Sequence, residues 1–182
     1  MAIDIMLPKV FTEDTDISGW LMSEKFDGVR GYWNGAALLS KHGAPIQPPE
    51  EFTRNFPPFA IEGEIWGGRG TFEQTVGVVK TRGPHPGWLT LKFAIFDVPE
   101  ASGGFLKRIE KAKEWFNKHP SQYAFVILAP FWSSSRTADN LRSVPASVTK
   151  RGKTRRRLAR QLPLNITACI NPVSPSFLPF CG

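Results

Sequence analysis

One stretch of the sequence decides how the rest is interpreted: Ser23-Glu24-Lys25-Phe26-Asp27-Gly28-Val29-Arg30-Gly31. A lysine stands two residues before an Asp-Gly turn signal, with an arginine shortly after the turn. A protonated lysine amine is a poor nucleophile, so a reactive one must be desolvated or lie near another cation. Asp-Gly favours a tight turn that would fix such a loop. Two interpretations are open, a solvated surface turn or a loop that presents Lys25 as a nucleophile.

Charge is distributed unevenly along the chain. The formal net charge of the 182 residues is +7. Residues 1–140 contain 15 Lys and Arg and 16 Asp and Glu, a balance of −1, whereas residues 141–182 contain 8 Lys and Arg and no acid, a balance of +8. The two parts therefore need separate explanations.

Composition narrows the class of protein. With 41% hydrophobic and 12% aromatic residues, the chain can bury a sizeable core, and its length suits one domain with a tail. It contains no run of about 18 apolar residues, so no membrane span is expected. The two cysteines, Cys169 and Cys181, do not form a C-x-x-C pair, so they predict no metal site.

Hydrophobic alternation and turn signals predict an antiparallel sheet. Strands are expected over residues 20–24 and 29–33, on either side of the Lys25 loop. Asn34-Gly35 is a strong hairpin signal, which predicts a return strand over residues 36–41.

A further predicted strand over residues 59–66 carries two acids, Glu62 and Glu64, on one face. Two carboxylates side by side need either solvent or cations. The strand is therefore either an exposed edge or the carrier of a carboxylate pair at a metal or ribose site.

Residues 89–98 alternate strongly and predict a central strand, with at least one of Phe93 and Phe96 in the core. A last strand is expected over residues 123–131. Both strands are expected to be buried.

The clearest predicted helix covers residues 105–118. Shorter helices are expected around residues 50–54 and over 71–81, the latter with Thr71 as its N-cap. The valine pair and Gly77 leave a strand open for this second stretch. The expected apolar stripe of the long helix is Leu106, Ile109, Ala112 and Phe116, and the expected polar side carries Lys107, Arg108, Glu110, Lys111, Lys113 and Glu114.

Three stretches together resemble the motifs of the covalent nucleotidyltransferases, which are the DNA ligases, RNA ligases and mRNA capping enzymes. They are Lys25-x-Asp27-Gly28-x-Arg30, then Glu62-Gly63-Glu64, then an apolar strand that ends in Phe96-Asp97. Glu62 stands where the family more usually has aspartate. The likeness is greatest to the small bacterial ATP-dependent DNA ligases, and it covers about residues 6–132.

The resemblance implies a role for each matching residue. Lys25 would be the catalytic nucleophile that forms a lysyl-AMP with ATP, and Phe96 would stack on the adenine. Glu64 would bind ribose or Mg²⁺. The implied nucleotide-contacting residues are Glu24, Arg30, Lys41, Glu64 and Phe96. Lys41 stands where the family has an arginine and lacks that residue's planar fork, so a solvated strand end is the other interpretation.

The fold implied by the resemblance is α+β, with antiparallel sheets flanked by helices around a nucleotide cleft. Residues 1–134 would be a partial adenylation domain, and residues 135–182 a basic, Pro/Ser-rich tail. The family's later motifs and its oligonucleotide-binding domain find no match. Either the tail is out-of-frame sequence that is non-native to the fold, or it is a basic arm that binds phosphates.

The implied function is ATP-dependent sealing of nicks in double-stranded DNA during replication, repair and recombination, with ATP and Mg²⁺ as cofactors. A monomer without membrane association is expected. Its nick-sealing activity is expected to be impaired, because the later motifs are missing. Residues 1–5 do not resemble a secretory signal. A leader that was removed and replaced by a start methionine would leave the same sequence, so the bacterial cytoplasm and the periplasm both stay open. An RNA ligase or capping enzyme is an alternative within the class. A non-catalytic nucleic-acid-binding remnant with a basic tail is an alternative outside it.

Overall fold

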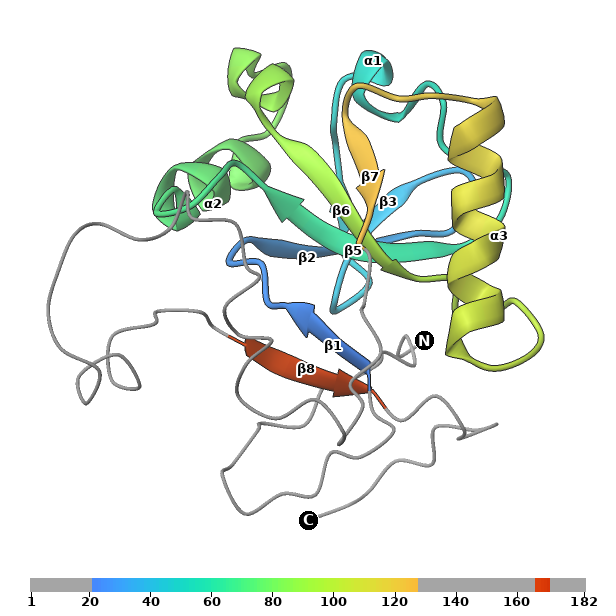
Figure 1. Cartoon of the computed structure of the whole chain (residues 1–182). Helices are drawn as coiled ribbons and strands as arrows, with labels where there is room; N and C mark the ends of the chain where they lie inside the picture. Colours follow the sequence, from blue (N-terminus) through green and yellow to red (C-terminus); the bar gives the residue numbers. More distant parts are fainter. Residues whose placement is uncertain (1–20, 128–165, 171–182) are drawn as a thin grey trace, which may run out of the picture. The chain divides into compact units, whose positions relative to one another are not determined.

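A computed structural model of the chain describes residues 21–127 and 166–170, which fall into two units (Figure 1). The smaller unit contains strands β1 (Leu21–Glu24) and β8 (Ile166–Ile170), which pair antiparallel with Leu21 opposite Ile170. Strand β1 confirms the strand predicted before Lys25, whereas β8 was not predicted. The remainder of the basic tail and residues 128–131 of the last predicted strand lie outside the described residues.

The larger unit, residues 26–127, is built on a six-stranded sheet with the order β4-β3-β2-β5-β6-β7. Its strands are β2 (Val29–Trp33), β3 (Leu38–Ser40), β4 (Pro45–Ile46), β5 (Ile61–Trp66), β6 (Lys92–Asp97) and β7 (Ala124–Val126). Its helices are α1 (Glu50–Thr53), α2 (Phe72–Lys80), the 3₁₀ helix η1 (Pro86–Thr90) and α3 (Phe105–Lys118). The α+β prediction is confirmed.

One pairing in this sheet departs from the predicted antiparallel arrangement. Strands β6 and β7 run parallel, while the other neighbouring strands pair antiparallel. Parallel neighbours need a crossover connection, usually a helix. Helix α3 provides it between β6 and β7, which alternation within the two strands cannot reveal.

The hairpin between β2 and β3 is confirmed, with a longer loop than Asn-Gly alone suggests. Asn34 Oδ1 accepts hydrogen bonds from the backbone N–H groups of Ala36 and Ala37, at 3.0 and 2.8 Å. Gly35 has φ of 96°, a conformation that glycine adopts without steric cost. The loop therefore spans four residues, and β3 begins at Leu38 rather than at residue 36.

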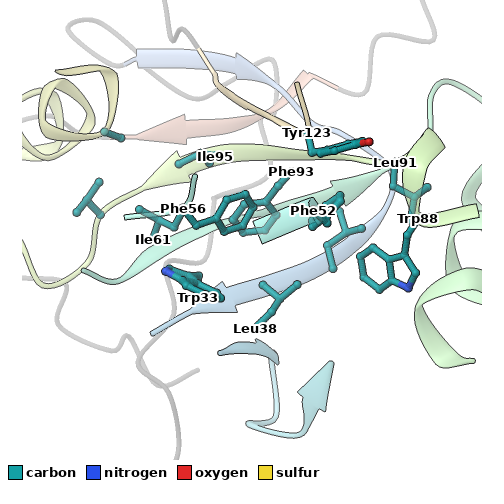
Figure 2. Close-up of a cluster of buried hydrophobic side chains, with 13 residues drawn as sticks. Trp33, Leu38, Phe52, Phe56, Ile61, Trp88, Leu91, Phe93, Ile95 and Tyr123 are labelled. Atoms are coloured by element: carbon teal, nitrogen blue, oxygen red, sulfur yellow. The ribbon is translucent and has the colours of Figure 1, made fainter. Parts of the chain in front are cut away.

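The hydrophobic core lies against one face of the sheet (Figure 2). Phe56, from the loop after α1, stacks on Phe93 of β6 with ring centroids 5.4 Å apart. Phe52 of α1 packs edge-on against Trp88 of η1 at 4.9 Å. Phe93 is fully buried and Phe96 only partly, as expected of a strand with one core face.

One predicted strand start and one predicted helix cap differ from the structure. The strand expected from residue 89 begins at Lys92, since η1 precedes it with His85 Nδ1 accepting from the Gly87 N–H at 3.0 Å. Helix α2 forms where it was predicted. Its Thr71 makes no side-chain cap, and the hydroxyl instead donates to the Gly68 carbonyl at 2.9 Å.

Helix α3 has the predicted bounds, but its buried face lies elsewhere than expected. The buried residues are Phe105, Arg108, Ile109 and Ala112. Leu106, predicted in the apolar stripe, is 53% exposed, and Arg108, predicted on the polar side, is 6% exposed. Both predictions were wrong, because hydrophobic spacing alone assigns an arginine to solvent.

Arg108 is buried because it neutralises a buried aspartate on β6. Its Nε donates to Asp97 Oδ1 at 2.8 Å and an Nη to Oδ2 at 3.1 Å. The guanidinium also donates to the Gly103 carbonyl at 3.3 Å. This two-point contact joins α3 to the end of β6, directly beside Phe96.

We expect Arg108→Ala to lower the free energy of unfolding by about 3–5 kcal/mol, because it leaves the Asp97 carboxylate buried without its partner. Lys107→Ala, at the exposed neighbouring position, should stay within about 0.5 kcal/mol of the parent. Urea denaturation of the full chain measures both. Equal effects of the two substitutions would contradict the described burial of Arg108.

Candidate functional site

Several polar and aromatic side chains share the sheet face opposite the core. In the β2–β5 pairing, Arg30 lies opposite Glu64 and Tyr32 opposite Glu62. Side chains alternate along a strand, so these residues face away from the core positions Trp33, Ile61 and Ile65. We define the polar face as Arg30, Tyr32, Glu62, Glu64 and Phe96.

The centre of the polar face is an ion pair between β2 and β5. Arg30 Nε donates to Glu62 Oε1 at 2.8 Å, and an Nη of the same guanidinium lies 2.6 Å from that oxygen. The Glu62 side chain is 1% exposed and the Arg30 side chain 16%. The exposed-edge interpretation of this strand is wrong, because β5 lies between β2 and β6.

Phe96 joins this ion pair from β6. The Arg30 guanidinium carbon lies over the Phe96 ring, 5.1 Å from its centroid. The β5–β6 register shifts between Glu62 and Gly63, so that Glu62 lies opposite Asp97 while Gly63 lies opposite Ile95. Such irregularities redirect side chains locally. Phe96 and Asp97, adjacent in sequence, thus contact Arg30 and Arg108 respectively.

Glu64 is half-buried and contacts the predicted nucleophile loop. Its Oε1 accepts a hydrogen bond from the Gly28 N–H at 3.2 Å. A Cβ at position 28 would collide with the carbonyl oxygen of Ile65, so only glycine lets this loop approach β5 so closely. Gly28 of the motif is therefore required by this packing.

Three aromatic rings pack together at the start of the larger unit, a contact that was not predicted from the sequence. Phe26 packs edge-on against Trp66 of β5 at 4.9 Å and against Phe125 of β7 at 5.7 Å. Trp66 and Phe125 lie 6.5 Å apart. An aromatic residue after a lysine gives no sequence signal for this contact, since its partners come from two distant strands.

The structure brings together three of the six predicted site residues, Arg30, Glu64 and Phe96. Glu24 and Lys25 belong to the smaller unit, in which Lys25 is exposed and Glu24 is the last residue of β1. Lys41 is exposed in the turn after β3, where the Gly43 N–H donates to the Ser40 carbonyl at 2.9 Å. Glu62 was quoted in the motif without a role, and its burial was not anticipated.

The carboxylates offer limited support for a metal. Among residues 21–127 and 166–170, no group of three or more His, Cys, Asp and Glu side chains is placed to hold an ion. Mg²⁺ in nucleotide sites usually takes one or two carboxylates, with phosphates and waters supplying the other ligands. Glu64, partly exposed, fits such a single-carboxylate role.

Two other features of the described residues lie apart from the polar face. A hollow of about 300 Å³ is lined by Glu51, Arg54, Asn55, Pro120, Ser121, Gln122 and Tyr123, none of them a predicted site residue. Within the described ranges, no helix is both long and apolar enough to cross a membrane.

Known proteins resemble this chain over much of its length. The chain is 44% identical over 124 residues to a DNA ligase of Haemophilus influenzae, an alignment that covers 68% of this chain and 46% of that protein. It therefore spans about half the length of the curated relative that it matches. No protein-family model matches the chain.

Solved structures resemble the fold. A structure from a study of DNA binding by Lig E DNA ligases superposes with a TM-score of 0.66 at 30% identity, covering 74% of this chain and 54% of that one. The Chlorella virus DNA ligase–adenylate superposes with a TM-score of 0.54, covering 69% of this chain and 49% of that one. At 19% identity, the second likeness bears on the fold alone.

The electrostatics of the polar face have a measurable consequence at Tyr32. Burial raises the pKa of its phenol to about 12, helped by its hydrogen bond to Glu100 and by the negative charges of Glu100 and Glu62. The Tyr32 hydroxyl donates to Glu100 Oε1 at 3.0 Å. In the unfolded chain the phenol has a pKa of about 10.

We expect the free energy of unfolding to fall as the pH rises from about 10 to about 12, because the unfolded chain releases the Tyr32 proton while the folded chain retains it. Tyr32→Phe should remove this part of the pH dependence. The chain has two tyrosines, so ultraviolet titration of Tyr123→Phe reports Tyr32 alone. Half-ionisation near pH 10 in the folded Tyr123→Phe protein would contradict the expectation.

Proposed function

We infer that this chain carries the adenylation domain of a DNA ligase, and we propose that it reacts with ATP to form a covalent lysyl-AMP at Lys25. The single observation that best supports the proposal is the meeting of Arg30, Glu64 and Phe96 on one sheet face. They come from three separate stretches of sequence, and each stretch matches a nucleotidyltransferase motif.

We assign residues 1–134 to this domain and residues 135–182 to a separate basic tail. The alignment with the Haemophilus influenzae protein over 124 residues supports an extent of this order. The described part of the domain, residues 26–127, has one core and one sheet, as a structural domain requires.

Each residue of the polar face has a proposed task in binding ATP. Phe96 offers a flat ring on which a base of any identity can stack. Glu64 accepts hydrogen bonds from the ribose or holds Mg²⁺ through its partly exposed carboxylate. Arg30 orients the nucleotide beside that ring. Lys41 and Glu24 stay secondary candidates, for which the motif pattern is the support.

The proposed reaction is nucleotidyl transfer. The neutral amine of Lys25 attacks the α-phosphorus of ATP, a P–N bond forms, the bond from that phosphorus to the bridging oxygen breaks, and pyrophosphate leaves with the electron pair. The attacking nitrogen then loses one proton to solvent and keeps the other as the N–H of the phosphoramidate. Mg²⁺, when bound, neutralises the phosphate oxygens. Phe26, fixed by Trp66 and Phe125, is the residue that follows Lys25 in the sequence.

We further propose that the AMP passes to the 5′-phosphate at a nick in double-stranded DNA, and that the 3′-hydroxyl then displaces it. This completes the sequence of steps that a DNA ligase performs, with DNA as the partner and a role in replication, repair or recombination. The likeness to a DNA ligase at 44% identity supports this assignment over an RNA ligase.

The charge distribution favours one alternative, a non-catalytic protein that binds nucleic acid through its tail. Residues 141–182 carry a balance of +8 without a single acid. Such a segment binds phosphates by releasing counterions, whatever the state of the nucleotide site. DNA binding that weakens steeply with salt and persists in Lys25→Ala, without any reaction with ATP, would favour this alternative.

We expect the intact mass of the full chain to rise by one AMP after incubation with ATP and Mg²⁺, because the amine of Lys25 captures the α-phosphate. Lys25→Ala should show no gain. Lys118→Ala, which removes an exposed lysine at the end of α3, should react like the parent. A folded parent that gains no mass, or a Lys25→Ala protein that still gains AMP, would overturn the proposal.

A further inference from the structure

Glu62 is a buried charge to which the proposed reaction gives no task. Its side chain is 1% exposed on a central strand. Removing a carboxylate from water is costly unless a cation and hydrogen bonds compensate for it. A hydrophobic residue would fill this position at lower cost, so the presence of glutamate calls for a reason beyond stability.

Glu62 makes a double contact with Arg30. Both Nε and an Nη of Arg30 lie within 2.8 Å of the same carboxylate oxygen, Oε1. Charged hydrogen bonds of this length are among the strongest that side chains make. The carboxylate therefore fixes where the guanidinium lies and how its plane is turned.

The strand register places these two residues within reach of each other. Arg30 lies opposite Glu64 and Tyr32 opposite Glu62, so Arg30 and Glu62 are diagonal neighbours on one sheet face. Diagonal positions are within range of long side chains. The same guanidinium lies over Phe96 of the next strand, 5.1 Å from the ring centroid. Arg30 is thus bounded by a carboxylate and by an aromatic ring.

We propose that Glu62 is a positioning residue of the nucleotide site, which holds Arg30 against one face of the Phe96 ring and leaves the other face for a purine base. This rests on the proposed function, in which Phe96 stacks on the base. Glu62 itself touches no substrate. Its effect is on the nucleoside end of the ligand, because the guanidinium that it holds lies beside the stacking ring.

The affinities for ATP and for a ligand with only its phosphates together distinguish a positioning role of Glu62 from a merely structural one. Inorganic tripolyphosphate carries the phosphates of ATP without the base and ribose. A substitution that loosens the whole sheet weakens binding of both ligands, whereas one that releases Arg30 from Phe96 weakens binding of ATP alone. Titration calorimetry in the Lys25→Ala background measures both affinities without any covalent step.

We expect Glu62→Gln to raise the Kd for Mg-ATP about tenfold, the effect of losing one charge-assisted contact, and to leave the Kd for tripolyphosphate unchanged. Glu62→Asp keeps the charge and should lose less. Glu110→Gln, at an exposed carboxylate paired with Lys113 on α3, should change neither affinity. Arg30→Lys should weaken ATP binding, and adding Glu62→Gln to it should cause little further loss.

Each outcome decides the question. If Glu62→Gln does not fold, Glu62→Asp and Arg30→Lys carry the same comparison of ATP with tripolyphosphate. An unchanged Kd for ATP in a folded variant, or an equal loss for both ligands, overturns the positioning role alone. If the parent in this background does not bind ATP, the positioning role and the proposed function fall together. A parent that binds ATP but forms no lysyl-AMP overturns only the proposed reaction.

Discussion

The ion pair between Arg30 and Glu62 is the interaction on which the rest of the polar face depends. Glu62 lies on a central strand, where a carboxylate without a cation would be strongly destabilising. Arg30, reaching across from β2, neutralises its charge and in doing so is held beside Phe96. One electrostatic requirement thus arranges side chains from three strands, and all three strands carry motif residues.

The two adjacent residues at the end of β6 have different roles. Phe96 belongs to the polar face and contacts Arg30, while Asp97 is buried and holds Arg108 of α3. The shifted register at Glu62 and Gly63 accompanies this division. Two arginines therefore contact this strand end, Arg30 on the polar face and Arg108 from helix α3. A change at Asp97 is expected to affect both.

Much of the fold follows from local sequence patterns, and the departures have physical reasons. The bounds of α3, the hairpin at Asn34 and the burial of Phe93 agree with alternation, helical periodicity and turn chemistry. Arg108 and Leu106 were misplaced because spacing cannot tell that a buried aspartate on another strand needs a guanidinium. The parallel pairing of β7 depends on how the chain returns after α3, which is a property of the whole sheet.

The residues of the candidate site were predicted from the motif resemblance rather than from alternation or helical periodicity. Arg30, Glu64 and Phe96 meet on one face, and the motif resemblance named all three without specifying how they contact one another. The same motif quotes Glu62 without a task, whereas its burial and its contact with Arg30 require the three-dimensional arrangement. Lys41, exposed in a turn, and the two residues of the smaller unit, Glu24 and Lys25, stay assignments from the motif.

The central claim is that the polar face receives the base of ATP on the Phe96 ring while Glu62 keeps Arg30 in place. A crystal structure of the full chain with Mg-ATP tests it most directly. We expect the adenine to stack on the face of Phe96 opposite Arg30, with the Arg30–Glu62 contact intact. Adenine bound away from Phe96, or Arg30 withdrawn from Glu62 to contact the phosphates, would contradict it.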